Sequence, residues 1–221
     1  NLYYMTKSNF SILTIASIAL FLVSCGGKNS EAADAQQVAQ ATELSTTFKV
    51  DAAASKLGWL GKKVTGQHNG NINISEGSIS VDKNNITAGS FVIDMKSITN
   101  EDITDAKTKE NFLGHMLSPD FFDVEKYPSS KFEITGVEKM ATADSMKILG
   151  NLTIKDVTKN IAIPAKVAMS ADNFEAVSAF TIDRTDWNIQ YGSGKFFKGL
   201  GDKMINDEIE FTLNLKAVPA K

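Results

Sequence analysis

From residue 47 onward, apolar and polar residues alternate along most of the chain. Between residues 208 and 216 every odd-numbered position is apolar and every even-numbered position is polar, and the same period of two returns in residues 89–96 and 161–169. Shorter runs occur at Ile72/Ile74, Ile79/Val81, Phe132/Ile134, Met146/Ile148, Leu152/Ile154 and Phe180/Ile182. Successive side chains of a strand point to opposite faces, so each run predicts an antiparallel strand with one buried face. Together with the turn signals between them, the runs predict about eight or nine strands.

One segment has a helical period instead. Between Asp105 and Leu117 the apolar residues Phe112, Leu113 and Met116 are three or four positions apart. This spacing places them on one face of a helix. Ser118-Pro119 follows, and because the residue before a proline disfavours helical geometry, the helix is predicted to end there.

Strands that are apolar on one face must bury that face against another layer or close on themselves. Helices and strands do not alternate along this chain, which argues against a parallel sheet. We therefore predict an all-β fold: an antiparallel barrel of about eight strands with one short helical insertion. A two-sheet sandwich is the alternative that the same alternation fits.

The composition is that of a folded domain and excludes several functions. Hydrophobic residues make up 43% of the 221 positions and the formal net charge is −3, which argues against a nucleic-acid partner because phosphate binding needs clustered basic residues. The single cysteine, Cys25, excludes an intramolecular disulfide and a cysteine-rich zinc site.

The first part of the chain has the pattern of an export signal. Lys7 precedes an apolar run, residues 12–23, that is shorter than the roughly 20 residues needed to cross a bilayer. The string Leu22-Val23-Ser24-Cys25 resembles a bacterial lipobox, which implies cleavage before Cys25 and acylation of that residue. We expect residues 1–24 to be a lipoprotein-type signal peptide and the mature protein to be anchored through Cys25 in the cell envelope, facing the periplasm or the surface. An uncleaved anchor helix with an incidental cysteine is the alternative.

Residues 25–46 are expected to connect the anchor to the folded domain. They are rich in Ala, Gln, Ser and Gly and show no apolar period. Such a composition is typical of a flexible tether. The barrel domain is therefore predicted to cover residues 47–221.

Several strings resemble the YceI-like family of periplasmic polyisoprenoid-binding proteins. They are Trp59-Leu60-Gly61-Lys62-Lys63-Val64-Thr65-Gly66-Gln67-His68-Asn69-Gly70, His115-Met116-Leu117-Ser118-Pro119-Asp120-Phe121-Phe122-Asp123-Val124, Leu149-Gly150-Asn151-Leu152-Thr153-Ile154-Lys155-Asp156-Val157-Thr158 and Asp183-Arg184-Thr185-Asp186-Trp187-Asn188-Ile189. The resemblance implies a lipocalin-like barrel with a helical insertion that binds a long isoprenoid chain without catalysis or cofactor. The chain departs from the family pattern at Met116 and at Leu117, where the family usually carries a basic residue, and this puts a contact to an anionic head group in doubt.

A long apolar ligand needs an apolar lining, and Phe, Ile and Leu of inward parity supply it. The expected lining residues are Phe91, Ile93, Phe132, Ile134, Ile148, Leu152, Phe180, Ile182, Phe211 and Leu213. Plain core packing is the competing interpretation for each of them. The small inward residues Gly89, Ala165, Ala176 and Ser178 favour free volume inside the barrel.

Two histidines, His68 and His115, lie in the family-like strings and are expected to make polar contacts at the mouth of the cavity. A metal site formed by both with Asp120 or Asp123, and a purely structural hydrogen bond for each, are the alternatives. The acidic residues Asp183 and Asp186 flank Arg184, and a turn with internal salt bridges explains them without acid–base catalysis.

The glycine-rich string at residues 192–195 lacks the first glycine and the final Ser or Thr of a phosphate loop, so it predicts a hairpin with exposed Lys195 and Lys198. The sequence contains no G-x-S-x-G, H-E-x-x-H or G-x-G-x-x-G motif. We therefore expect no catalytic residues and no metal. The favoured function is the binding of a polyisoprenoid or similar chain, with a homodimer possible. An enzyme or isomerase acting on a small apolar molecule and a structural protein with a filled barrel are the alternatives.

Overall fold

The last strand of the chain pairs with the second and third strands, so that the sheet closes into a barrel. The computed structural model describes residues 32–142 and 144–220, and every strand pairing in it is antiparallel. The strands are β1 (Ala33–Asp34), β2 (Thr46–Val50), β3 (Lys56–Lys63), β4 (Gly66–Asp82), β5 (Asn85–Asp94), β6 (Ser129–Lys139), β7 (Ser145–Ile154), β8 (Val157–Met169), β9 (Phe174–Asp183) and β10 (Ile205–Pro219). From β4 to β10 each strand pairs with the next one along the chain.

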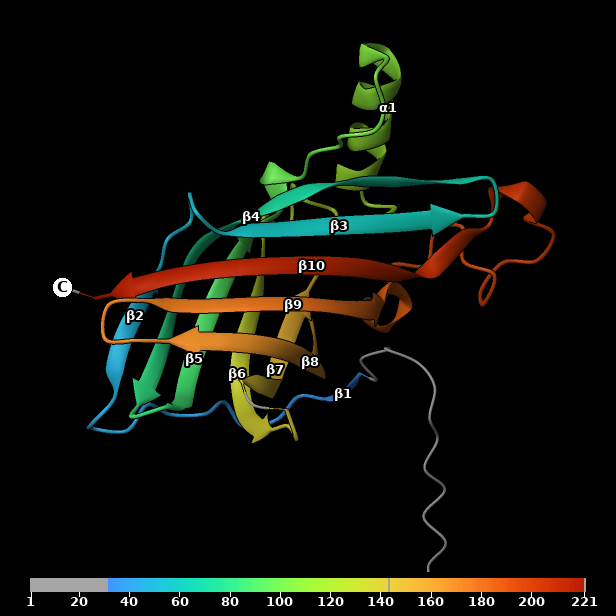
Figure 1. The fold of residues 1–221 in the computed structure, drawn as a ribbon. Helices are drawn as coiled ribbons and strands as arrows, with labels where there is room; N and C mark the ends of the chain where they lie inside the picture. Colours follow the sequence, from blue (N-terminus) through green and yellow to red (C-terminus); the bar gives the residue numbers. More distant parts are fainter. Residues whose placement is uncertain (1–31, 143, 221) are drawn as a thin grey trace, which may run out of the picture.

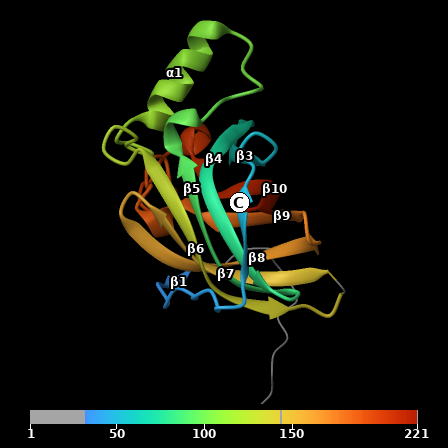
Figure 2. The ribbon, with the colours of Figure 1, turned by 90° about the vertical axis from the view of Figure 1, so that its left-hand side faces the viewer.

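Strands β2 and β3 together fill one position in the barrel wall. Both lie between β4 and β10: β3 pairs with the first part of each, and β2 with the last part. With β2 and β3 counted as one, the wall has eight strands, which confirms the predicted closed antiparallel barrel and rules out the sandwich (Figures 1 and 2).

The barrel has two unlike ends. One, which we call the helix end, carries the helix α1 (Ala106–Leu117), the β3–β4 and β7–β8 turns and the segment between β9 and β10. That segment contains the short 3₁₀ helices η2 (Arg184–Trp187) and η3 (Gly201–Lys203), while η1 (Met95–Ser97) follows β5 at the same end. The other, the far end, carries the β4–β5, β6–β7 and β8–β9 turns.

Helix α1 lies over the helix end of the barrel (Figure 2). Its bounds confirm the predicted insertion. The Asp105 carboxylate caps its first turn by accepting from the Thr108 N–H at 2.8 Å, and the helix ends at Ser118, before Pro119. Phe112 and Met116 of its apolar face pack against a buried cluster that includes Trp59. Within the described residues no helix is long and apolar enough to cross a bilayer.

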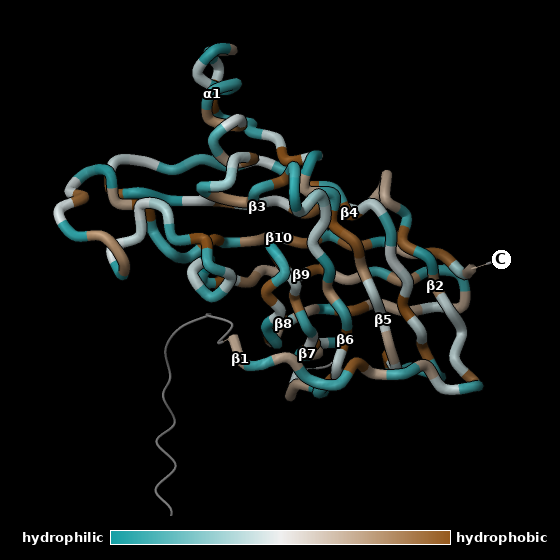
Figure 3. The backbone as a smooth tube through the Cα atoms, turned by 180° about the vertical axis from the view of Figure 1, so that it is seen from behind, coloured by the Kyte–Doolittle hydropathy of each residue, from teal (hydrophilic) through white to brown (hydrophobic). Residues whose placement is uncertain are grey.

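Apolar side chains fill the far end of the barrel. Phe48, Ile79 and Phe174 are among its most buried residues, and the rings of Phe48 and Phe174 lie 6.2 Å apart. Hydrophobic and hydrophilic residues alternate along the strands (Figure 3). The far end is therefore closed by its own core.

Part of the segment predicted as a tether is attached to the barrel. Strand β1 pairs with the start of β8, and beyond it the Gln36 N–H donates to Asn151 Oδ1 at 2.9 Å while Asn151 Nδ2 donates to the Gln36 carbonyl at 2.7 Å. The Ala39 N–H donates to the Ile134 carbonyl at 2.9 Å. These bonds hold residues 33–39 in an extended path along the outer wall, where a flexible tether was expected. Residues 1–31, which include the predicted signal peptide and Cys25, lie outside the described residues.

Candidate ligand cavity

A cavity of about 520 Å³ lies inside the barrel. All twelve residues expected at the ligand site line it: Phe91, Ile93, Phe132, Ile134, Ile148, Leu152, Phe180, Ile182, Phe211, Leu213, His68 and His115. The eleven that lie on strands come together because inward parity is shared by every second residue of each strand, and the closed wall turns those positions toward one interior. His115 is brought there by α1.

Four phenylalanines form much of the middle of the cavity wall. Phe91 and Phe132 lie on adjacent strands with ring centroids 6.3 Å apart, and Phe180 and Phe211 stack at 5.3 Å. Gly150 leaves room for one of them, since a Cβ at this position would lie 2.1 Å from the Phe132 ring. Aromatic rings on neighbouring strands therefore pack against each other within the wall, which is apolar. The space along the barrel axis stays open.

Sequence reasoning missed several lining residues. Trp59 lines the cavity, as do Phe112 and Met116 of α1 and Phe121 after it. The helical spacing of Phe112 and Met116 marked an apolar face, but that the face covers the barrel interior depends on how the insertion folds back. The expected small residues Ala165 and Ala176 do line the cavity.

His68 stands at the helix end of the cavity and is held by Asp102. The Nδ1 atom lies 2.7 Å from Asp102 Oδ2, and the ring lies 4.6 Å from the Phe112 ring. The same carboxylate accepts from the Asn69 N–H and from Asn100 Nδ2. Partial burial raises the pKa of Asp102, but these hydrogen bonds outweigh it and the pKa is lowered.

His115, on α1, lies in a separate group of contacts. Its Nε2 atom lies 3.2 Å from Asp120 Oδ2, and its ring contacts those of Phe121 and Tyr191 at 5.1 and 4.5 Å. The two histidines thus have different carboxylate partners. No group of three or more His, Cys, Asp or Glu side chains in the described part of the chain is arranged to hold a metal ion.

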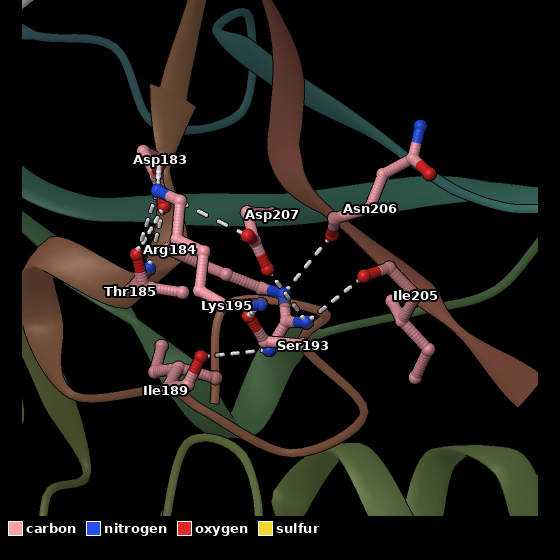
Figure 4. Close-up of polar contacts among 9 residues, drawn as sticks. All are labelled: Asp183, Arg184, Thr185, Ile189, Ser193, Lys195, Ile205, Asn206 and Asp207. Carbon is pink, nitrogen blue, oxygen red and sulfur yellow. Dashed lines mark hydrogen bonds and ion pairs between the residues drawn. The ribbon is translucent and has the colours of Figure 1, made fainter. Parts of the chain in front are cut away.

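Arg184 is buried beside the cavity and ties the segment after β9 to the start of β10 (Figure 4). Its guanidinium donates to the carbonyls of Ile189, Ile205 and Asn206 at 2.7 to 3.2 Å and lies 3.3 Å from Asp207 Oδ1. Burial lowers the pKa of Arg184, although Asp207 and Asp183 oppose the shift. The guanidinium keeps its charge, because an arginine pKa stays far above neutral pH.

The expected salt bridges within the Asp183–Asp186 turn are not formed. Asp183 instead accepts from Lys195, and Arg184 turns to Asp207 (Figure 4). Burial raises the pKa of Asp183, but the bonds from Lys195 and Thr185 lower it overall. Lys195 and Lys198 are exposed, as expected, and Lys195 is ion-paired. Their segment forms turns and a 3₁₀ helix where a hairpin was expected.

The cavity opens at the helix end. The exposed members of its lining, which include Lys63, Gln67, Tyr191 and Lys203, lie at the adjoining ends of β3 and β4, in the segment between β9 and β10, or at the start of β10. The deep lining is made of buried side chains such as Ile79, Ile161 and Phe174. A ligand would therefore have an apolar body inside and a polar end at this opening.

Comparison with known proteins agrees with this architecture. The model of the YceI-like domain matches residues 48–217. The chain belongs to the YceI-like family. A UPF0312 protein of Azotobacter vinelandii is 30% identical over 155 residues, covering 69% of this chain and 71% of the relative. A UPF0312 protein of Pseudomonas aeruginosa is 35% identical over 104 residues, covering 47% of this chain and 51% of the relative, so the match to it spans about half its length.

Two solved structures share the fold of this family member. Burkholderia cenocepacia BcnA superposes with a TM-score of 0.62 at 23% identity, covering 76% of this chain and 99% of that one. A polyisoprenoid binding domain from Saccharophagus degradans, implicated in plant cell wall breakdown, gives 0.55 at 16% identity, covering 79% and 99%. At these identities the likeness shows the lipocalin-like barrel and no more.

Proposed function

We propose that this protein binds a polyisoprenoid or a similar long apolar chain inside the barrel and sequesters or carries it without catalysis. The observation that carries the proposal is the cavity itself: apolar along its length, closed at the far end and bordered by polar side chains only at the helix end. A ligand with an apolar chain and a polar terminus matches that distribution.

The size and chemistry of the cavity suit such a ligand. Its volume, about 520 Å³, is in the ordinary range for sites that enclose a small organic molecule. Burial of a methylene group contributes about 0.8 kcal/mol, so each five-carbon unit of a polyprenyl chain would add roughly 4 kcal/mol before the losses of ordering are subtracted. The Saccharophagus degradans domain, described as polyisoprenoid binding, supports this ligand class by its shared fold.

The alternatives are less well supported. A filled structural barrel would leave no such cavity. An enzyme acting on a small apolar molecule would need a titratable group deep in the lining, whereas the histidines and the carboxylate of the lining, His68, His115 and Asp202, all lie at the helix end.

The place of action we propose is the cell envelope. The export pattern of residues 1–24 and the lipobox-like string ending in Cys25 support secretion followed by acylation. Several acyl chains would be needed for stable anchoring, since a single chain binds a membrane only marginally.

A pair of matched substitutions on β9 tests the binding site. Ala176 lines the cavity, whereas Ala179 on the same strand is exposed on the outer face. We expect Ala176→Phe to weaken binding of a radiolabelled polyprenyl alcohol at least about tenfold by occupying the ligand volume, and Ala179→Phe to leave it unchanged. Thermal unfolding of both variants verifies that the barrel is intact. Equal binding by the two variants would remove the interior from consideration as the site.

A further inference from the structure

Exposed apolar side chains gather beside the cavity opening. Tyr191, Phe196, Phe197 and Met204 between β9 and β10, together with Val64 in the β3–β4 turn, are each between 37% and 56% exposed. The Val64 N–H donates to the Met204 carbonyl at 3.4 Å, so the turn and the segment lie side by side (Figure 1). We call these five residues the rim patch; among the described residues it includes every exposed aromatic side chain.

The same two loops are positively charged in a chain that is negative overall. Residues 61–67 and 191–204 contain five lysines and one aspartate, while the whole chain has a net charge of −3. Lys62 and Lys195 are paired with carboxylates. In the part of the chain that the structure describes, Lys63, Lys198 and Lys203 have no ion-pair partner. Aromatic rings mixed with free lysines are typical of surfaces that lie in the headgroup layer of an anionic membrane.

The N-terminal segment joins the barrel wall near the helix end. The proposed anchor at Cys25 would therefore lie close to that end of the barrel. Strand β1 pairs with β8 at Asn160 and Lys159, only a few residues from the β7–β8 turn at the helix end. Ala33 lies eight positions after Cys25 in the sequence. Such a length spans at most about 28 Å when fully extended, so the anchor would hold the helix end close to the bilayer.

We propose that the rim patch docks on the surface of an anionic lipid bilayer, so that the cavity opening faces the membrane. The inference rests on the proposed function and deepens it, because it names the surface through which an apolar chain passes between bilayer and barrel. Tyr191 belongs to both the cavity lining and the rim patch, which makes the apolar surface continuous from the membrane to the interior. Each free lysine near the anionic surface strengthens docking by electrostatic attraction.

Depth-dependent quenching tests the proposal on the mature protein produced from its full chain. A bimane label is attached at Thr65→Cys, beside the rim patch, or at Asp172→Cys in the β8–β9 turn at the far end, with the parent protein treated in the same way as the blank. Vesicles contain equal parts of phosphatidylcholine and phosphatidylglycerol with brominated acyl chains. We expect the label at position 65 to lose about half of its emission and the label at position 172 to keep its emission. In the Thr65→Cys protein, the further pair Phe196→Ser and Phe197→Ser should restore most of the emission.

Three outcomes would overturn the docking proposal. The first is equal quenching at the two positions, and the second is no quenching at position 65. The third is a dimer that shows no quenching and that dissociates in the Phe196→Ser, Phe197→Ser variant. This last result would assign the rim patch to a second copy of the chain. Lipid extraction and the mass of the peptide containing Cys25, measured on the same preparation, report cargo and anchor separately. A protein with cargo and anchor but no quenching would keep the proposed function and lose the docking surface.

Discussion

The two ends of the barrel differ in how they are packed, although the same alternating strands form both. At the far end the inward residues Phe48, Ile79 and Phe174 touch one another and leave no opening. At the helix end the cavity lining includes exposed side chains, and polar groups such as the His68–Asp102 and His115–Asp120 pairs border it. The far end thus supplies stability, and the helix end supplies access.

This division explains why a stable barrel can also hold a cavity. Burial of large side chains against each other gives the most stabilisation where no ligand has to pass. The helix end is instead held by directed bonds, above all those of Arg184, which fix loops without filling the interior.

The largest difference between the ends should appear in the core. Phe48→Ala should lower the free energy of unfolding by about 4 kcal/mol, because it leaves a void in a packed cluster outside the cavity lining. Phe180→Ala, in the cavity wall, should cost less than half as much, since its ring already borders empty space. Urea denaturation of both variants measures the two values, and equal losses would contradict the distinction.

The next effect concerns the bonds that hold the helix end. Arg184→Met should lower the free energy of unfolding by about 3 kcal/mol, because three backbone carbonyls lose their hydrogen-bond donor and Asp207 loses its buried partner. Amide exchange should accelerate first in residues 189–206, before the far end is affected. Asp207→Asn is the control, and it should be milder because the guanidinium keeps its three carbonyl acceptors.

A smaller effect is expected for the attached N-terminal segment. Asn151→Ala removes both hydrogen bonds to Gln36, together with the one that Asn151 accepts from Asn160 Nδ2, and should cost about 1 kcal/mol. The signature is faster amide exchange in residues 33–39 with the barrel strands unchanged. Lys159→Ala removes only the exposed ion pair to Asp34 and should have almost no effect. Comparable exchange in the two variants would show that Asn151 does not hold the segment.

The smallest effect is a pH dependence confined to the helix end. The pKa of Asp102 is lowered on folding, so its ionised form adds stability that is fully present above the ordinary aspartate pKa of about 3.9 and is lost as the pH falls through the lower folded value. The melting temperature of Asp102→Asn should therefore lie slightly below that of the parent at pH 6 and converge with it near pH 2. A difference that stays constant with pH would exclude the carboxylate as the cause.

Much of the fold was predictable because its cause is local. The period of two in residues 208–216 fixes which face of β10 is buried, and Asp105 with Pro119 marks the two ends of α1. The cavity residues followed from the same parity, since Phe91, Phe180 and Phe211 occupy inward positions of their strands.

The remaining features depend on contacts between distant positions. Arg184 pairs with Asp207, 23 residues away, while the nearer Asp183 is occupied by Lys195. Residues 33–39 have no pattern of their own, and what holds them is the side chain of Asn151 together with unpaired backbone groups of the wall. The size of the cavity, likewise, depends on how eight strands close and not on any single residue.

The central claim is that the interior of the barrel holds a long apolar chain, and native mass spectrometry tests it most directly. The protein is produced in a bacterium, purified without detergent and weighed intact, and the released lipid is extracted and identified. The account predicts one isoprenoid-class chain per barrel, absent from the Ala176→Phe variant and present in Ala179→Phe. A protein that carries no lipid, and whose mass is unchanged after incubation with polyprenyl lipids, would contradict it.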